Sequence, residues 1–293
     1  MNLYQEIAQR LKDADTVIIG ASNGLSISEG LNIFADDLWF QENFGDFREK
    51  YGIHSLIEGA FCRFSSEQEK WAFTSRYVSK KSYLEPPSRM MRQLYDLVKE
   101  KDYFVVTTNG EDHFVPAGFS PERIFEMEGK NTEMRCSRGC CDEVYYNREA
   151  ILCMAQAEQN GVVPQELLPV CPRCGGPMDV NMANNQRFFQ TRRWQEKMIT
   201  YQSFMKQHHK SRIIVLELGV GRRNSLIKAP LLQLAQIAPQ LTYVIFNKGE
   251  LNIPPEIASK AIGVDGDIAE ALNRIYQNIY PDCSEYSIKS ILI

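Results

Sequence analysis

Short apolar runs recur along the chain between amphipathic segments. Each run is rich in β-branched residues and stops at a glycine or a small polar residue, which is typical of a buried strand. Because the runs are apolar throughout rather than alternating, they predict a mostly parallel sheet that is covered on both faces. The predicted strands are Thr16–Gly20, Tyr103–Thr107, Ile213–Leu218, Thr242–Asn247 and Ala261–Asp265.

Helical patterns lie between these strands. They are predicted over residues 3–12, Arg89–Lys99, Leu226–Ile237 and a final helix with Ile268, Leu272, Ile275 and Ile279 on one face. Alternation of strands and helices predicts an α/β fold with a Rossmann-like, doubly wound parallel sheet. We assign residues 1–34, 86–124 and 190–293 to this main domain.

Two stretches do not follow the alternation. Residues 35–85 are rich in aromatic side chains and have a helical pattern, and residues 125–189 hold two cysteine pairs. We interpret them as a helical insert and a zinc-ribbon insert that together form a smaller domain. Metal binding suits an insert of this size, because it supplies folding energy that a small core lacks.

The cysteine spacing is more informative than the count of eight. Cys136 and Cys140 form a C-x3-C pair, Cys171 and Cys174 a C-x2-C pair, and four such thiolates complete the coordination of a structural zinc ion. Four buried reduced cysteines, or a redox pair, are the alternatives, and Cys141 is a possible replacement for Cys140 as ligand. The isolated cysteines are predicted to pack as small hydrophobic residues; they are Cys62, Cys153 and Cys283.

Composition and charge restrict the classes of partner. The 293 residues carry 33 Lys and Arg against 37 Asp and Glu, so the net charge of −4 argues against nucleic acid as the partner. No apolar run reaches the roughly 18 residues that cross a bilayer, and the N-terminal segment lacks the pattern of a secretory signal. We therefore expect a cytoplasmic protein that does not interact with membranes.

Candidate chemistry gathers where four predicted strands end. Glycine and small polar residues follow them in Gly20–Ser26, Thr107–Asp112, Gly219–Ser225 and Asn247–Gly249. Any one of these segments is also consistent with a tight turn or a helix cap. Because ligands of open α/β sheets bind beyond the carboxyl ends of the strands, the four together predict a dinucleotide cleft.

The order of these segments resembles the sirtuin family over nearly the whole chain. Gly24–Gly30 looks like the loop G-[IV]-S-x-x-[SA]-G, Thr107–Glu111 looks like T-Q-N-I-D, and Ala117-Gly118 matches the A-G that follows. Gly219–Gly221 lies at the position of G-T-S, and Asn247 at that of the adenine-ribose asparagine. The cysteine pairs match the zinc ribbon of the family.

The departures from the family pattern point to a subclass. Gly30–Ala35 lacks the Asp and Arg of G-I-P-D-F-R, and Glu128 stands where sirtuins carry the catalytic histidine. The segments T-T-N, C-S-x-x-C and L-E-L-G-V-G are most similar to the bacterial class M, or macrodomain-linked, sirtuins. Members of that class resemble protein ADP-ribosyltransferases, and they replace the histidine by glutamine.

The resemblance implies an NAD-dependent protein ADP-ribosyltransferase that transfers ADP-ribose from NAD to a protein acceptor and releases nicotinamide. It implies Asn109 and Glu128 as catalytic residues. The implied NAD-binding residues are Gly20, Ala21, Ser22, Gly24, Leu25, Ser26, Thr108, Asn109, Gly110, Glu111, Glu128, Gly219, Val220, Gly221, Asn224, Asn247, Lys248, Asp267 and Ile268.

Three other functions stay open. One is an NAD-dependent deacylase, for which Glu128 or, less well, His113 would have to supply the missing base. The second is an NAD hydrolase or NAD sensor, and the third is a scaffold held together by zinc. The class resemblance also suggests a lipoyl carrier protein as acceptor, a macrodomain protein as the reversing enzyme, and a monomeric state.

Overall fold

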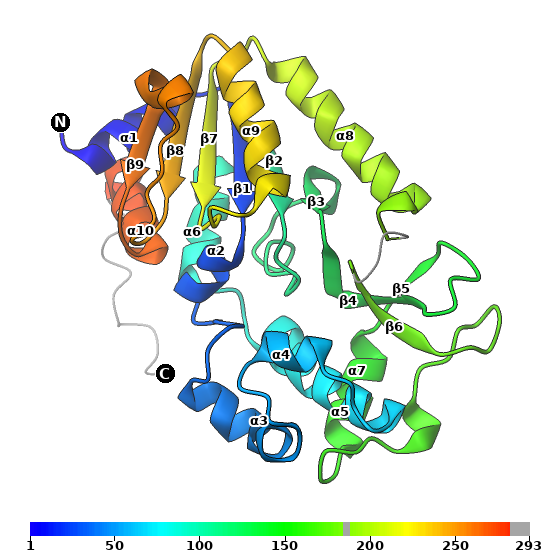
Figure 1. The fold of residues 1–293 in the computed structure, drawn as a ribbon. Coiled ribbons are helices and arrows are strands. Elements are labelled where there is room, and N and C mark those ends of the chain that lie inside the picture. The colour runs from blue at the N-terminus through cyan, green and yellow to red at the C-terminus, as the bar shows by residue number, and fades with distance from the viewer. Residues whose placement is uncertain (184–187, 282–293) are drawn as a thin grey trace, which may run out of the picture.

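A computed structural model describes residues 1–183 and 188–281 (Figure 1). Its main sheet has six strands in the order β3-β2-β1-β7-β8-β9, and all neighbouring strands run parallel. The strands are β1 (Thr16–Ala21), β2 (Asp102–Thr107), β3 (Ile124–Glu126), β7 (Ile213–Leu218), β8 (Leu241–Phe246) and β9 (Ala261–Val264). The predicted α/β fold with a doubly wound parallel sheet is confirmed.

Helices cover both faces of this sheet. In β1, Val17 and Ile19 pack against one face and Ile18 against the other, as the two-residue period of a strand requires. One face is covered by α1 (Leu3–Asp13), α6 (Arg89–Val98) and α10 (Ile268–Ile279), the other by α8 (Arg192–His208) and α9 (Ser225–Ile237). The strand order reverses between β1 and β7, and α2 (Asn23–Ser28) begins where β1 ends.

The two inserts lie beside each other beyond the carboxyl ends of the strands (Figure 1). The first contains α3 (Leu38–Tyr51), α4 (Leu56–Phe61), α5 (Glu67–Val78) and a π-helical turn, η1 (Ser79–Leu84). The second contains α7 (Arg148–Ala157) and an antiparallel sheet of β5 (Val144–Tyr146), β4 (Gly129–Cys136) and β6 (Met178–Met182). Short 3-10 turns are η2 (Pro121–Arg123), η3 (Gln165–Leu167), η4 (Phe188–Gln190) and η5 (Pro255–Lys260).

A single hydrophobic core joins the inserts. Phe44 and Trp71 from the first segment pack in one cluster with Ile151 and Met178 from the second. The ion pair between Lys70 and Asp179, at 2.7 Å, also links them. Two stretches of chain on either side of β2 therefore share one core, and we interpret them together as the smaller domain.

No helix within residues 1–183 and 188–281 combines the length and the apolar character that a bilayer crossing requires. Of the isolated cysteines, Cys62 is partly buried against the insert core, as predicted. Cys153 is exposed on α7, so the prediction that it packs as a small hydrophobic residue is wrong, and Cys283 lies outside the described residues.

Candidate active site

A cleft of about 550 Å³ opens at the carboxyl ends of the main sheet. Its walls come from the segments that follow β1, β2, β7 and β8, which is where the strand order reverses and where open α/β sheets bind ligands. The volume is in the range of small-molecule and cofactor sites. The predicted residues that line the cleft are Ser22, Gly24, Thr108, Glu128, Gly219, Gly221, Asn224 and Asn247.

Two glycines let opposite walls of the cleft touch. The N–H of Gly24 donates to the carbonyl of Gly219 at 3.0 Å. A Cβ on Gly24 would lie 2.5 Å from the Cα of Gly219, which is closer than real Cβ contacts. Gly219 also has a φ of +61°, in the left-handed region that favours glycine. Bare backbone is therefore required on both sides of this contact.

A small polar network closes the floor between β1, β2 and β7. The Thr108 hydroxyl donates to Ser22 Oγ at 3.0 Å. Asn224 Nδ2 reaches Ser22 Oγ at 3.2 Å and Thr108 Oγ1 at 3.1 Å. These contacts fix three cleft-lining side chains from three separate loops.

Asn109 lies next to Thr108 and has one unsatisfied atom. Its Nδ2 donates to Ser26 Oγ at 2.8 Å, and the Ser26 hydroxyl donates to Glu111 through a short hydrogen bond. The buried Oδ1 of Asn109 has no hydrogen-bond partner among the described residues. A buried acceptor of this kind is costly unless a bound molecule donates to it.

Glu128 is half-buried in the wall of the cleft. Burial raises the pKa of its carboxyl group, as expected when the charged form loses hydration. The ionised carboxylate is therefore a stronger base than a glutamate in water.

His113 does not act as a free base in this arrangement. Its Nδ1 lies 2.7 Å from Glu29 Oε2 and its Nε2 lies 2.6 Å from the carbonyl of Lys81. Burial lowers the pKa of His113, but the hydrogen bond and charge of Glu29, with the charge of Glu111, outweigh it and raise the value to about 9. At neutral pH both nitrogens hold protons, so the ring cannot accept one.

The other predicted residues do not line the cleft. Gly20 and Ala21 lie within β1, and the side chains of Leu25, Val220 and Ile268 are buried in the hydrophobic cores. Asp267 caps α10 and also contacts Ser28 at 3.2 Å. Ser26, Asn109 and Glu111 form the cluster behind the wall, Gly110 lies against Met182, and Lys248 is exposed.

Six residues that were not predicted also line the cleft. They are Asn23, Ile27, Phe34, Arg223, Ser225 and Leu226. Each lies in or just beyond a glycine-rich segment that the sequence pattern does identify. The sequence pattern does not say in which direction these side chains point, because that depends on how each loop turns after its strand.

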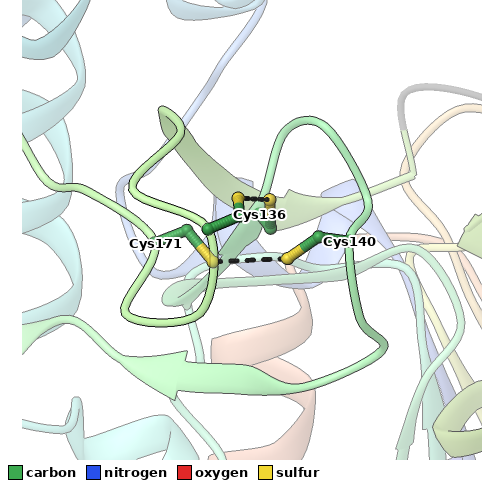
Figure 2. Close-up of side chains that lie close together, drawn as sticks. Cys136, Cys140 and Cys171 are labelled. Atoms are coloured by element: carbon green, nitrogen blue, oxygen red, sulfur yellow. Dashed lines mark hydrogen bonds between the residues drawn. The ribbon is translucent and has the colours of Figure 1, made fainter.

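The four paired cysteines converge in the zinc ribbon (Figure 2). Their sulfurs are 3.6 Å apart for Cys136 and Cys174, and 3.5 Å apart for Cys140 and Cys171. A tetrahedral zinc ion with Zn–S bonds of about 2.3 Å holds its sulfurs about 3.8 Å apart, so the four residues fit this metal. Cys140, and not Cys141, belongs to the group of four.

Electrostatics of the cluster also fit a cation. The backbone N–H of Cys140 lowers the pKa of the Cys136 thiol, and that of Cys174 lowers the pKa of Cys171. In contrast, desolvation and hydrogen bonds to the neighbouring sulfurs raise the pKa of Cys140, so this thiol keeps its proton in the absence of a cation. A divalent ion bound among the sulfurs would displace that proton, because a coordinating thiol is deprotonated.

A second cavity, of about 70 Å³, lies between the zinc ribbon and α8. Ion pairs occupy part of its lining, for example Arg193 with Glu133 and Lys130 with Asp112. It has room for little more than water.

Solved structures with the same architecture are sirtuins. A structure of a Sir2 homologue–NAD complex has a TM-score of 0.59 and 14% identity, and the match covers 96% of this chain and 95% of that one. A structure concerned with sirtuin substrate affinity has a TM-score of 0.58 and 18% identity, covering 94% and 98%. The chain has the sirtuin fold. No protein-family model matches it.

Curated relatives add a link between the sirtuin fold and ADP-ribose chemistry. A protein ADP-ribosyltransferase of Staphylococcus aureus is 28% identical over 270 residues, which are 92% of this chain and 85% of that protein. A probable bifunctional ADP-ribose hydrolase/ADP-ribosyltransferase of Fusarium oxysporum is 26% identical over 220 residues, 72% of this chain but 36% of that protein. The predicted resemblance is confirmed in two respects. The fold is similar to that of sirtuins, and the sequence is similar to proteins named as ADP-ribosyltransferases.

Proposed function

We propose that the protein is an NAD-dependent protein ADP-ribosyltransferase of the sirtuin type. The observation that carries the proposal is the half-buried carboxylate of Glu128 in the cleft, at the position where deacylating sirtuins have a histidine base. Similarity to the ADP-ribosyltransferase of Staphylococcus aureus along 92% of the chain supports it.

The cleft suits NAD on three counts. Gly24 and Gly219 leave bare backbone where a pyrophosphate needs close approach. Asn109 lies behind the wall, next to the cleft-lining Thr108, and we propose its unsatisfied Oδ1 as the acceptor that a ribose hydroxyl reaches when NAD binds. Asn247, at the end of β8, is our candidate for the adenine ribose, and the other predicted NAD-binding residues remain proposals.

Transfer requires one bond to break and one to form. The bond between the ribose anomeric carbon and the nicotinamide nitrogen breaks, and its electron pair neutralises the pyridinium as nicotinamide leaves. A lone pair of the acceptor side chain forms the new bond to that carbon. The proton of the acceptor passes to Glu128 or to water.

Glu128 serves this chemistry through its negative charge. Positive charge develops on the ribose ring as nicotinamide departs, and a carboxylate fixed nearby stabilises it. Asn109 would hold the ribose hydroxyls and so orient the sugar. We assign both residues as catalytic under this proposal.

The acceptor is a protein, by analogy with the relatives whose names state this activity. We propose a lipoyl carrier protein as the first acceptor to test and a macrodomain protein as the reversing enzyme, on the class resemblance alone. We also expect a cytoplasmic monomer.

One observation favours deacylation as a second candidate. Because burial raises the pKa of Glu128, its carboxylate is a stronger base than usual and can take a proton from a ribose hydroxyl. Deacylation would convert an acyl-lysine peptide and NAD into O-acyl-ADP-ribose, the free lysine peptide and nicotinamide, whereas transfer needs no acyl group.

The deciding experiment incubates the protein with NAD labelled in its adenylate half and with a lysate of its source. We expect a labelled protein band that survives boiling in detergent, and its mass begins to identify the acceptor. O-acyl-ADP-ribose from an acylated peptide would establish the deacylase, and free ADP-ribose without a labelled band would establish the hydrolase.

A further inference from the structure

We infer that His113 is a positioning residue that determines which atom of the Asn109 side-chain amide is left for NAD. The inference rests on the proposed function. It adds how the side-chain amide of Asn109 is oriented so that its oxygen is left to accept from the ribose. It depends on a chain of contacts from η1 and α2 to the loop after β2.

The contacts of His113 require a doubly protonated ring. The Lys81 carbonyl, 2.6 Å from Nε2, can only accept a hydrogen bond. Glu29, 2.7 Å from Nδ1, accepts as a carboxylate, and its side chain is 4% exposed. Since both partners accept, both ring nitrogens donate, and the ring is a cation.

This cation lies beside a buried glutamate. Ligand atoms of His113, Glu29 and Glu111 all lie within 4.8 Å of one another, and Glu111 is 5% exposed. Burial raises the pKa of Glu111, while the charge of His113 and the Ser26 hydroxyl oppose that rise. The same cluster is not a metal site, because neither ring nitrogen of His113 has a free lone pair.

Other charged or titratable groups nearby do not replace His113. The Lys81 ammonium faces away, toward Glu85 and the Trp39 ring at 4.4 Å. Asp112 is paired with Lys130 at 3.2 Å. Tyr77, on α5, has its pKa raised by burial and by the charge of Glu111, so it stays neutral.

When Glu111 is ionised, it fixes the next two hydrogen bonds. A carboxylate only accepts, so the single proton of Ser26 goes to Glu111. Ser26 Oγ then only accepts from the amide, which places Asn109 Nδ2 toward Ser26 at 2.8 Å. Oδ1 is therefore the atom left over, as an acceptor, and a ribose hydroxyl can donate to it.

A neutral Glu111 removes this constraint, because a protonated carboxyl has both a donor and an acceptor oxygen. Its O–H can donate to Ser26, Ser26 can then donate to the amide oxygen, and Asn109 rotates. The atom left over would then be the NH2 group, a donor only. By favouring the ionised form of Glu111, His113 thus favours the arrangement in which Asn109 presents an acceptor.

The first test needs no cofactor. We would measure the carboxyl pKa of Glu111 by ¹³C NMR in the wild type, His113→Gln and His113→Lys, with His208→Gln as the matched control. His208 contacts Thr16 at 3.1 Å, at the opposite end of β1, so its loss leaves the cluster intact. We expect His113→Gln to raise the Glu111 pKa by at least one unit. We expect His113→Lys, which keeps a positive charge, to return that pKa to the wild-type value.

The second test measures NAD affinity from pH 5 to 9 by calorimetry, in a Glu128→Gln background so that Glu128 does not titrate. We expect affinity to fall on the acidic side as Glu111 takes a proton, and His113→Gln to move this fall to higher pH by at least one unit. Glu111→Gln removes the titrating group and keeps an oxygen that accepts from Ser26, so it should abolish the fall in affinity on the acidic side. In a Ser26→Ala background, His113→Gln should add no further pH shift.

If the Glu111 pKa is unchanged in folded His113→Gln, the inference is overturned. A loss of NAD affinity that is equal at every pH also overturns it, because that result is expected if His113 only holds the loop in place. Thermal melting identifies any variant that fails to fold, and His113→Lys then provides the charge comparison. If the wild type binds no NAD, the proposed function fails, while the NMR result still decides whether His113 controls the ionisation of Glu111.

Discussion

Glu128 combines a negative charge with partial burial, and this combination distinguishes it from an ordinary surface carboxylate. Replacing it by glutamine keeps the shape of the side chain and removes the charge. We predict that Glu128→Gln lowers kcat for transfer by about 100-fold, the order expected for losing one electrostatic contact to the transition state, with NAD affinity within a few-fold of wild type.

The pH profile adds a second measurement of the same residue. Because burial raises the pKa of Glu128, wild-type kcat should rise with pH through a value above that of a free glutamate and then level off. The matched control is Glu166→Gln, which removes an exposed carboxylate from η3 and should leave kcat unchanged. Transfer at the wild-type rate in Glu128→Gln would contradict the assigned role.

The contact between Gly24 and Gly219 belongs to the scale of elements, because it joins the loop after β1 to the loop after β7. We predict that Gly219→Ala destabilises the protein by about 1–3 kcal/mol and weakens NAD binding, since the methyl group meets backbone atoms and the positive φ is strained. Chemical denaturation and calorimetry measure the two effects.

Gly45→Ala is the matched control. It lies within α3, and a Cβ there meets nothing within 4 Å. Alanine favours a helix over glycine, so this variant should be as stable as the wild type or slightly more so. Equal stability of Gly219→Ala and Gly45→Ala would mean that the two cleft loops can separate at no cost.

Element prediction succeeded where a local pattern carries the information. The five predicted strands and the four predicted helices occur with ends shifted by only a residue or two. β3 is missing from the prediction because three residues are too short for a periodic signal, and the boundary proposed at residue 125 falls inside it. The π-helical turn at Ser79–Leu84 likewise has no periodicity that identifies it.

The site was predictable to the level of its loops but not of its contacts. Glycine-rich strand ends identify the cleft, and the cysteine spacing identifies the four metal ligands. His113 pairs with Glu29, which lies 84 positions away in the chain, and with Lys81, which lies 32 positions away. No local sequence pattern can indicate contacts over such separations. The unsatisfied oxygen of Asn109 is visible only once all its neighbours are placed.

At the scale of the whole molecule, zinc supports the smaller domain rather than the chemistry. Cys136 and Cys171 are themselves part of the core that the two inserts share. We predict that Cys171→Ser loses the bound metal and lowers the melting temperature by several degrees or more, because metal binding and folding are coupled. Elemental analysis and a thermal melt check this.

Cys153→Ser is the control, because Cys153 is an exposed residue of α7 outside the group of four. It should keep its metal and its melting temperature. A metal-free Cys171→Ser protein that melts like the wild type would show that the ribbon folds without zinc. Any loss of transfer should follow the loss of folded protein rather than precede it.

The shared core of the inserts has a consequence during synthesis. Val78 closes the first set of core residues and Met178 is the last residue of the second, so 100 positions separate them. At a translation rate of about 5–20 residues per second, the ribosome needs roughly 5–20 s to deliver the second half. During that interval Phe40, Phe44 and Trp71 have no partner from the ribbon. A nascent chain halted before residue 178 should therefore be captured by chaperones that bind exposed aromatic surface, and release should follow completion of the ribbon.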